Sequence, residues 1–127
     1  GDDIPNLSGV CFSVLSMLAE QQLKRGQSAI LDSTARSHQV RDEWIAIASK
    51  YRAHHIAIHC ICSDPNVHRQ RIEGRERGIP GWYELSWANV EDAAKRFDDW
   101  TTECLICECC DPLEANLAHV ENYIRDA

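Results

Sequence analysis

The chain has 127 residues, enough for one domain whose hydrophobic core needs no disulfide or metal to hold it. Its formal net charge of −7, from 20 acidic and 13 basic residues, argues against an extended nucleic-acid surface and against adhesion to anionic membranes. No apolar run reaches the ~18 residues of a membrane helix. The run Val10–Ala19 follows Asp2 and Asp3 rather than a basic region, so we expect no signal peptide and a cytoplasmic protein with reduced thiols.

The first predicted element is a largely buried helix that begins near Leu7. A basic last turn and Gly26 are typical of its end. Its apolar residues recur at helical spacing: Leu7, Val10, Cys11, Val14 and Leu18. AILDST (29–34) is predicted to be a short strand closed by Asp32, and residues 35–39 a loop. A second amphipathic helix follows, with one apolar stripe: Val40, Trp44, Ile47, Ala48 and Tyr51.

Two later segments share the pattern of a strand, an Asp-Pro pair and a helix. IAIHCIC (56–62) is a continuous apolar run, typical of strands buried on both faces, and Asp64-Pro65 predicts a helix cap and first turn. CLICECC (104–110) leads likewise to Asp111-Pro112, with Glu114 as the partner in a capping box. The last helix is expected to bury four residues: Leu113, Leu117, Val120 and Ile124.

Another amphipathic helix is predicted over residues 87–97, between the two strand–helix units. The alternation predicts an α/β fold with a parallel sheet, in which ligands bind at the carboxyl ends of the strands. Those ends are residues 32–34, 63–64 and 108–111.

The first candidate site is ILDST followed by Arg36 and Arg41. An aspartate that ends a buried strand, beside hydroxyl groups and arginines, suits a hydrated Mg²⁺ next to phosphates. The alternative is structural: Ser33, Thr34 or Ser37 caps the next helix.

The second candidate is HRQRIEGRERG (68–78). Arg71 and Arg75 are four residues apart, so on a helix they would share a face and could hold one polyphosphate. A solvated charged helix is the alternative, although the scarcity of apolar residues also fits a mobile cover. The next stretch, GIPGWYELSW, predicts an ordered loop with packed aromatic residues and leaves base stacking as an alternative.

Four of the seven cysteines lie within residues 104–110. Cys104 and Cys107 have a zinc-site spacing, but an odd separation sends strand side chains to opposite faces. Cys107 and Cys109 share a face, as do Cys60 and Cys62, and the two strands could be neighbours. Positions i and i+2 lie ~6.6 Å apart on a strand, however, while zinc ligands lie within ~4 Å of each other. The sequence therefore favours packing thiols, and leaves a metal site, a disulfide or a reactive thiol as alternatives.

These features, in this order, resemble the P-loop kinase-like ATP-binding proteins of the AAA class, among them polynucleotide 5′-kinases, gluconate-type kinases and zeta toxins. QLKRGQSAILDST resembles the segment that leads to the family's Walker-B-like aspartate. HCICSDPNVHRQRIEGR resembles its fourth strand and an arginine-bearing lid, here residues 68–81, and CLICECCDPLEANL resembles its last strand and helix. The resemblance implies a three-layer, P-loop NTPase-like fold, ATP and Mg²⁺ as cofactors, and phosphoryl transfer to a small molecule or a nucleotide hydroxyl.

The resemblance also implies roles for single residues. Asp32 would organise Mg²⁺, and Arg71 and Arg75 would close over the phosphates of ATP. The acceptor would be faced by Thr34, Arg36 and Arg41.

The resemblance has one large departure. The family's opening strand and Walker A loop, G-x-x-x-x-G-K-[ST], are not among the 127 residues. We therefore expect a single partial domain over residues 1–127, missing the N-terminal strands, that binds ATP weakly or not at all and is inactive as it stands. Direct pairing of the 29–34 and 56–62 strands, a second copy of the chain, or a longer polypeptide would fill the gap in the sheet. A non-enzymatic interaction or oligomerisation module is the main alternative, and a cysteine-based metal or redox site is the second.

Overall fold

The computed structural model describes residues 7–127 and divides the chain into two units, residues 1–55 and 56–127. Asp2 and Asp3, on which the signal-peptide argument rests, lie outside the described residues. Within residues 7–127 no helix combines the length and hydropathy that a membrane span requires. The single domain and the three-layer sheet stay predictions.

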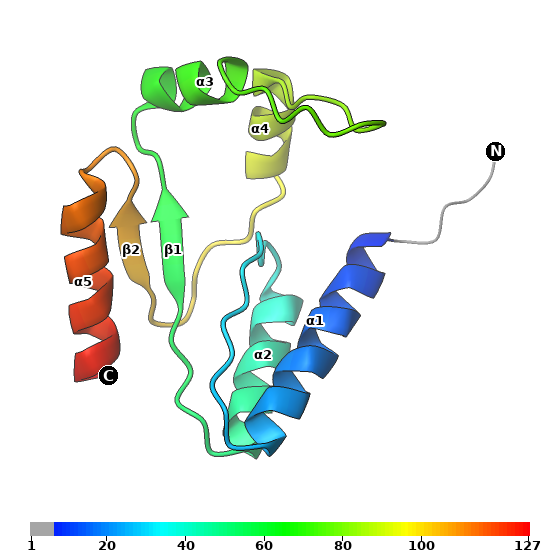
Figure 1. Cartoon of the computed structure of the whole chain (residues 1–127), viewed down its shortest axis with the longest axis vertical. Coiled ribbons are helices and arrows are strands. Elements are labelled where there is room, and N and C mark those ends of the chain that lie inside the picture. The colour runs from blue at the N-terminus through cyan, green and yellow to red at the C-terminus, as the bar shows by residue number, and fades with distance from the viewer. Residues whose placement is uncertain (1–6) are drawn as a thin grey trace. The chain divides into compact units, whose positions relative to one another are not determined.

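The first unit is a pair of helices, α1 (Leu7–Lys24) and α2 (His38–Lys50) (Figure 1). The indole nitrogen of Trp44 donates to Ser16 Oγ at 3.0 Å, and the Trp44 and Phe12 rings lie 6.2 Å apart between centroids. At the other end of the pair, Glu20 Oε1 accepts from Lys50 Nζ at 2.6 Å. Both predicted helices are confirmed.

The ends of these helices follow from local backbone chemistry. Gly26 adopts a positive φ of 73°, and Gln27 N donates back to Gln22 O at 3.0 Å, which closes α1 as predicted. Ser37 caps α2, since its side chain accepts from Val40 N. The structural alternative at this loop, a capping serine, is therefore confirmed for Ser37.

The strand predicted at AILDST is wrong for this structure. Residues 29–34 form no strand, and Ile30 is 95% exposed. A strand is stabilised by ladder hydrogen bonds to a neighbour, and the sheet in the described part of the chain holds only β1 and β2. The hypothesis that this segment pairs directly with the 56–62 strand is wrong for the same reason.

The second unit is built on a two-stranded parallel sheet of β1 (Ile58–Ile61) and β2 (Leu105–Glu108) (Figure 1). Cys60 lies opposite Cys107, and Ile61 lies opposite Glu108. Cys109 N then donates to Ile61 O at 2.7 Å, one residue past the end of β2. Both predicted strands and their parallel direction are confirmed, over shorter ranges.

Three helices complete this unit: α3 (Pro65–Glu73), α4 (Trp87–Ala94) and α5 (Leu113–Asp126). Asp64 caps α3 as predicted, with Pro65 in the first turn. The capping box predicted for the last helix is wrong: Pro112 is the cap residue and no side chain caps α5. Asp111 lies in the preceding turn, where its amide donates to Glu108 O at 3.1 Å, so the helix begins one residue later than the sequence suggests.

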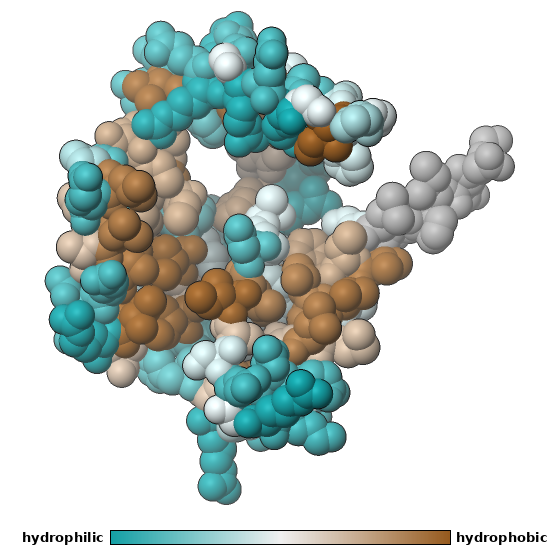
Figure 2. Space-filling model, viewed as in Figure 1, coloured by the Kyte–Doolittle hydropathy of each residue, from teal (hydrophilic) through white to brown (hydrophobic). Residues whose placement is uncertain are grey.

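The buried core of the described residues is small. Its buried apolar residues are Ala19, Ala48, Ala57 and Cys107. Large apolar side chains of α1 stay exposed, and Leu113, Leu117 and Ile124 of α5 are 71%, 51% and 50% exposed. Hydrophobic patches are visible on the molecular surface (Figure 2). The predictions of a largely buried first helix and of a buried stripe on the last helix are therefore wrong, because a helix pair and a two-stranded sheet offer too little surface to cover them.

Candidate functional site

The carboxyl ends of β1 and β2 lie side by side, because the two strands are parallel and in register. The Glu108 carboxylate bridges the two chain segments that leave the sheet. Its Oε1 accepts from Ser63 N at 3.2 Å and from Cys110 N at 3.0 Å, while Oε2 accepts from Ser63 N at 3.3 Å. We call Cys62, Ser63, Glu108 and Cys110 the strand-end cluster. The two strand ends therefore lie together as the parallel sheet predicts, and ligand binding there stays a prediction.

Hydrogen bonds set the charge state of this cluster. The Ser63 side chain, followed by the amides of Cys110 and Ser63, lowers the pKa of Glu108 to about 2. The carboxylate is therefore ionised at neutral pH. The backbone of Asp64 lowers the pKa of Cys110, but the Cys62 thiol, the Glu108 carboxylate and burial outweigh it and raise this pKa to about 11.

The cysteines divide into two groups. Cys62 and Cys110 belong to the strand-end cluster, and their Sγ atoms lie 3.3 Å apart. Cys60 lies on the sheet, where burial and the thiols of Cys107 and Cys109 raise its pKa. The prediction that the thiols pack is confirmed for Cys107, which is 8% exposed, and is wrong for the exposed Cys60 and Cys110.

The structure separates the two arginines that were predicted to act together. Arg71 lies in the last turn of α3, and its Nη1 donates to Cys109 O at 2.8 Å, beside the strand-end cluster. Arg75 lies beyond the helix, which ends at Glu73 with Gly74 as the cap residue. The argument from a shared helix face is therefore wrong. Within the described chain the Arg75 side chain is exposed and makes no hydrogen bond or ion pair, and its predicted contact with phosphate stays a prediction.

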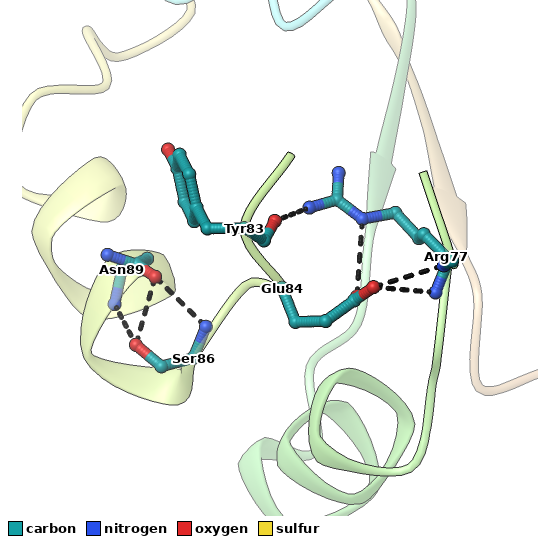
Figure 3. Close-up of polar contacts among 6 residues, drawn as sticks. Arg77, Tyr83, Glu84, Ser86 and Asn89 are labelled. Carbon is teal, nitrogen blue, oxygen red and sulfur yellow. Dashed lines mark hydrogen bonds and ion pairs between the residues drawn. The ribbon is translucent and has the colours of Figure 1, made fainter. Parts of the chain in front are cut away.

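The loop between α3 and α4 is held by its own polar contacts (Figure 3). Glu84 Oε1 accepts from the amides of Arg77 and Gly78, at 3.0 and 3.2 Å, and Arg77 Nη2 donates to Tyr83 O at 2.7 Å. Ser86 and Asn89 then form the capping box that begins α4. The predicted ordered loop has a physical basis in these bonds.

The aromatic residues of this loop do not pack into a core. Trp82 and Tyr83 are 59% and 66% exposed, with nearly parallel rings 6.2 Å apart. The prediction of packed aromatic residues is wrong for these two. The prediction is confirmed for Trp87, whose ring makes an edge contact with the His68 ring at 5.2 Å between centroids.

The other predicted site residues belong to the first unit. Asp32 and Thr34 are exposed, and Arg36 is half-buried. Arg41 is only 4% exposed, and its guanidinium donates to Ala35 O at 2.7 Å and to Arg36 O at 3.3 Å. Arg41 thus holds the loop that carries Arg36, and the acceptor-binding and Mg²⁺-binding roles stay predictions.

Two grooves mark the surface of the first unit. One, of about 440 Å³, lies along α1, and another, of about 270 Å³, lies between α1 and residues 28–31. Their linings hold none of the candidate residues, so the chemistry described above lies elsewhere.

The contact of Cys62 with Cys110 does not follow from the sequence pattern. Strand alternation places Cys60 with Cys62 on one face, and Cys107 with Cys109 on one face. Cys110 lies one residue beyond Cys109 in a turn, and only that turn brings it to Cys62. The signal available in the sequence was the parallel strand pair itself, whose ends each carry a cysteine.

Comparison with known proteins gives one family. The sequence profile of the AAA domain family, which is P-loop kinase-like, matches residues 2–99. The matched stretch includes α1 to α4 and β1, while β2, α5 and the cysteines from Cys104 onward lie outside it. No curated protein and no solved structure gives a significant match. Because the match covers more than half of the chain, the protein belongs to the AAA domain family.

Proposed function

We propose that the chain is a nucleotide-binding domain of the P-loop kinase type, whose parent activity is ATP-dependent phosphoryl transfer to a small molecule or to a nucleotide hydroxyl. The observation that carries this proposal is the family match over residues 2–99. Kinases of this kind position ATP and its Mg²⁺ through fixed loops and charges rather than through covalent chemistry. We propose polynucleotide 5′-kinases, gluconate-type kinases and zeta toxins as relatives of the chain, because the order of its motifs resembles theirs.

In this proposal Asp32 organises a hydrated Mg²⁺. An exposed carboxylate supports this role, since Mg²⁺ keeps several waters and needs only one or two protein carboxylates. Arg75, exposed and without an ion pair in the described chain, contacts phosphate directly, and Arg71 does so by exchanging its bond to Cys109 O. Thr34 and Arg36 face the acceptor, and Arg41 supports the loop beneath them.

The 127 residues hold no G-x-x-x-x-G-K-[ST] segment, so the amides and lysine that cradle ATP phosphates are not among them. We therefore expect millimolar rather than micromolar binding of Mg·ATP, without turnover. Backbone amide NMR during a Mg·ATP titration measures this. Shifts should saturate at millimolar ATP and concentrate on residues 32–36 and 71–75. Asp32→Asn should remove the part of the affinity that depends on Mg²⁺, and Asp42→Asn, on the exposed side of α2, should not.

Micromolar binding would contradict the proposed weak affinity. Saturable binding whose shifts avoid both segments would contradict the assigned residues.

A second function, an interaction or oligomerisation module, is favoured by the exposed apolar stripe of α1. Val10, Val14, Met17 and Leu18 are 43–55% exposed and recur at helical spacing. Such a stripe is typical of a surface that another polypeptide covers.

A further inference from the structure

Three potential metal ligands meet in the strand-end cluster. The Sγ atoms of Cys62 and Cys110 and a carboxylate oxygen of Glu108 all lie within 4.8 Å of one another. Among residues 7–127 these three form the one such group of cysteine, histidine and carboxylate donors. None of them serves the phosphoryl-transfer roles proposed above, and two of them lie beyond the stretch that matches the family.

The spacing of the donors fits a tetrahedral ion. With Zn–S bonds of about 2.3 Å, tetrahedral zinc holds two sulfurs ~3.8 Å apart. The Sγ–Sγ distance is 3.3 Å, so the thiols need to separate by only about half an ångström to take up that geometry. This arrangement differs from a set of four thiolates on the flat sheet face, where neighbouring positions lie too far apart.

The backbone around the donors is already held in place. Cys109 N donates to Ile61 O at 2.7 Å, and Arg71 Nη1 donates to Cys109 O at 2.8 Å, which fixes the turn before Cys110. Asn116 Nδ2 donates to Glu108 O at 2.8 Å from α5. The Glu108 Oε1 atom accepts from the amides of Ser63 and Cys110, and Oε2 accepts one long bond from Ser63 N, so the carboxylate is held between the two strand ends. A ligand set fixed in this way loses little freedom when an ion binds.

We propose that Cys62, Glu108 and Cys110 form a three-ligand site for a thiophilic divalent cation such as Zn²⁺, with water in the fourth position. On binding, each thiol releases its proton to solvent, and the dication offsets most of the three negative charges of the two thiolates and the carboxylate. Three protein ligands with an open fourth position are typical of zinc sites that bind a further ligand rather than of closed structural sites.

A titration of the reduced chain with Cd²⁺ tests the proposal. Calorimetry and the thiolate-to-cadmium charge-transfer absorption both measure the binding. We expect one tight equivalent. Cys62→Ser and Cys110→Ser should each weaken binding by more than ~100-fold, because even the loss of an outer-shell partner costs about 10- to 100-fold. Glu108→Gln should weaken it by about 10-fold, since the amide oxygen is a neutral donor. Cys11→Ser and Cys60→Ser are matched controls and should bind as the unaltered chain does.

Circular dichroism of each variant checks its fold, and the exposed Cys110 provides a second test if Cys62→Ser fails to fold. Binding that survives Cys62→Ser and Cys110→Ser would overturn the proposal, as would binding that Cys60→Ser abolishes. If two thiols fail to titrate without reductant, and the reduced chain then takes up no cadmium, the two cysteines form a redox pair. That result would overturn the proposal as well.

Discussion

At the scale of single residues, Arg41 is predicted to face the phosphate acceptor, and in this structure its side chain donates to the carbonyl oxygens of Ala35 and Arg36. The loop needs this support because Ala35 adopts a positive φ of 38°, which is unfavourable for a residue with a Cβ atom. A sequence shows that an arginine follows ILDST, but not whether its guanidinium points outward or back to the chain. The exposure of 4% settles that point.

Arg41→Met should therefore destabilise the first unit rather than act only on ligand binding. Hydrogen bonds to charged groups contribute about 1.5–3 kcal/mol, and the substitution leaves two half-buried carbonyl oxygens without this donor, so we expect a loss of about 2 kcal/mol. Urea unfolding followed by circular dichroism measures the change.

Arg36→Met is the matched control for this measurement. The Arg36 side chain makes no hydrogen bond or ion pair within the described residues, so its loss should change the free energy of unfolding by less than ~0.5 kcal/mol. Equal effects of the two substitutions would contradict the structural role of Arg41.

At the scale of elements, the two Asp-Pro pairs indicate more than the positions at which helices begin. Aligning Asp64-Pro65 with Asp111-Pro112 places Cys60 opposite Cys107, which is the register that the sheet adopts. From the sequence we predict both strands and their direction, but not their register. Nor does the sequence predict that the 29–34 segment stays unpaired, because a strand depends on a neighbour that its own residues do not specify.

The helix caps give an element-scale prediction, since two aspartates that look alike in sequence differ in the structure. Asp64 Oδ1 accepts from the amides of Asn66 and Val67, at 2.9 and 3.3 Å, whereas Asp111 caps nothing. Asp64→Ala should cost about 1 kcal/mol of stability in the second unit, and Asp64→Asn much less, because an amide oxygen also caps.

Asp111→Ala is the control, measured by the same urea unfolding, and it should leave stability unchanged to within ~0.5 kcal/mol. A larger loss for Asp111→Ala than for Asp64→Ala would show that the capping box suggested by the sequence forms after all.

The candidate site was predictable only in part for a related reason. The sequence correctly brings the residues after both strands to one edge of the sheet, because parallel strands place their carboxyl ends together. The contact of Cys62 with Cys110 depends on the turn at residues 109–110, where Asp111 N donates to Glu108 O. A one-residue change in where a strand ends sends a side chain to the other face, so alternation alone could not pair these thiols.

At the scale of the whole molecule, the main feature is apolar surface that the described chain does not cover. Sequence periodicity correctly identified which helix faces are apolar, but it assigned them to a core. Burial depends on the total surface that neighbouring elements supply, which no single helix pattern contains. Figure 2 shows apolar side chains on the molecular surface over α1, and the exposed residues there follow one face of the helix.

This surface predicts that the 127-residue chain self-associates through α1. Residues 10, 14, 17 and 18 have the i, i+4, i+7, i+8 spacing with which one helix packs against another, so two copies can bury this stripe together. Sedimentation velocity should show a sedimentation coefficient that rises with protein concentration. Leu18→Glu should shift the chain to the monomer, because the stripe then carries a charge that association would bury.

Ile79→Glu is the matched control, because Ile79 is 50% exposed, close to the 53% of Leu18, but lies in a loop away from any helix stripe. It should sediment as the unaltered chain does. A monomer at every concentration, or equal dissociation by both substitutions, would contradict association through α1. Association that Leu18→Glu removes while the weak Mg·ATP affinity stays unchanged would show that the apolar stripe and the nucleotide site act independently in this family member.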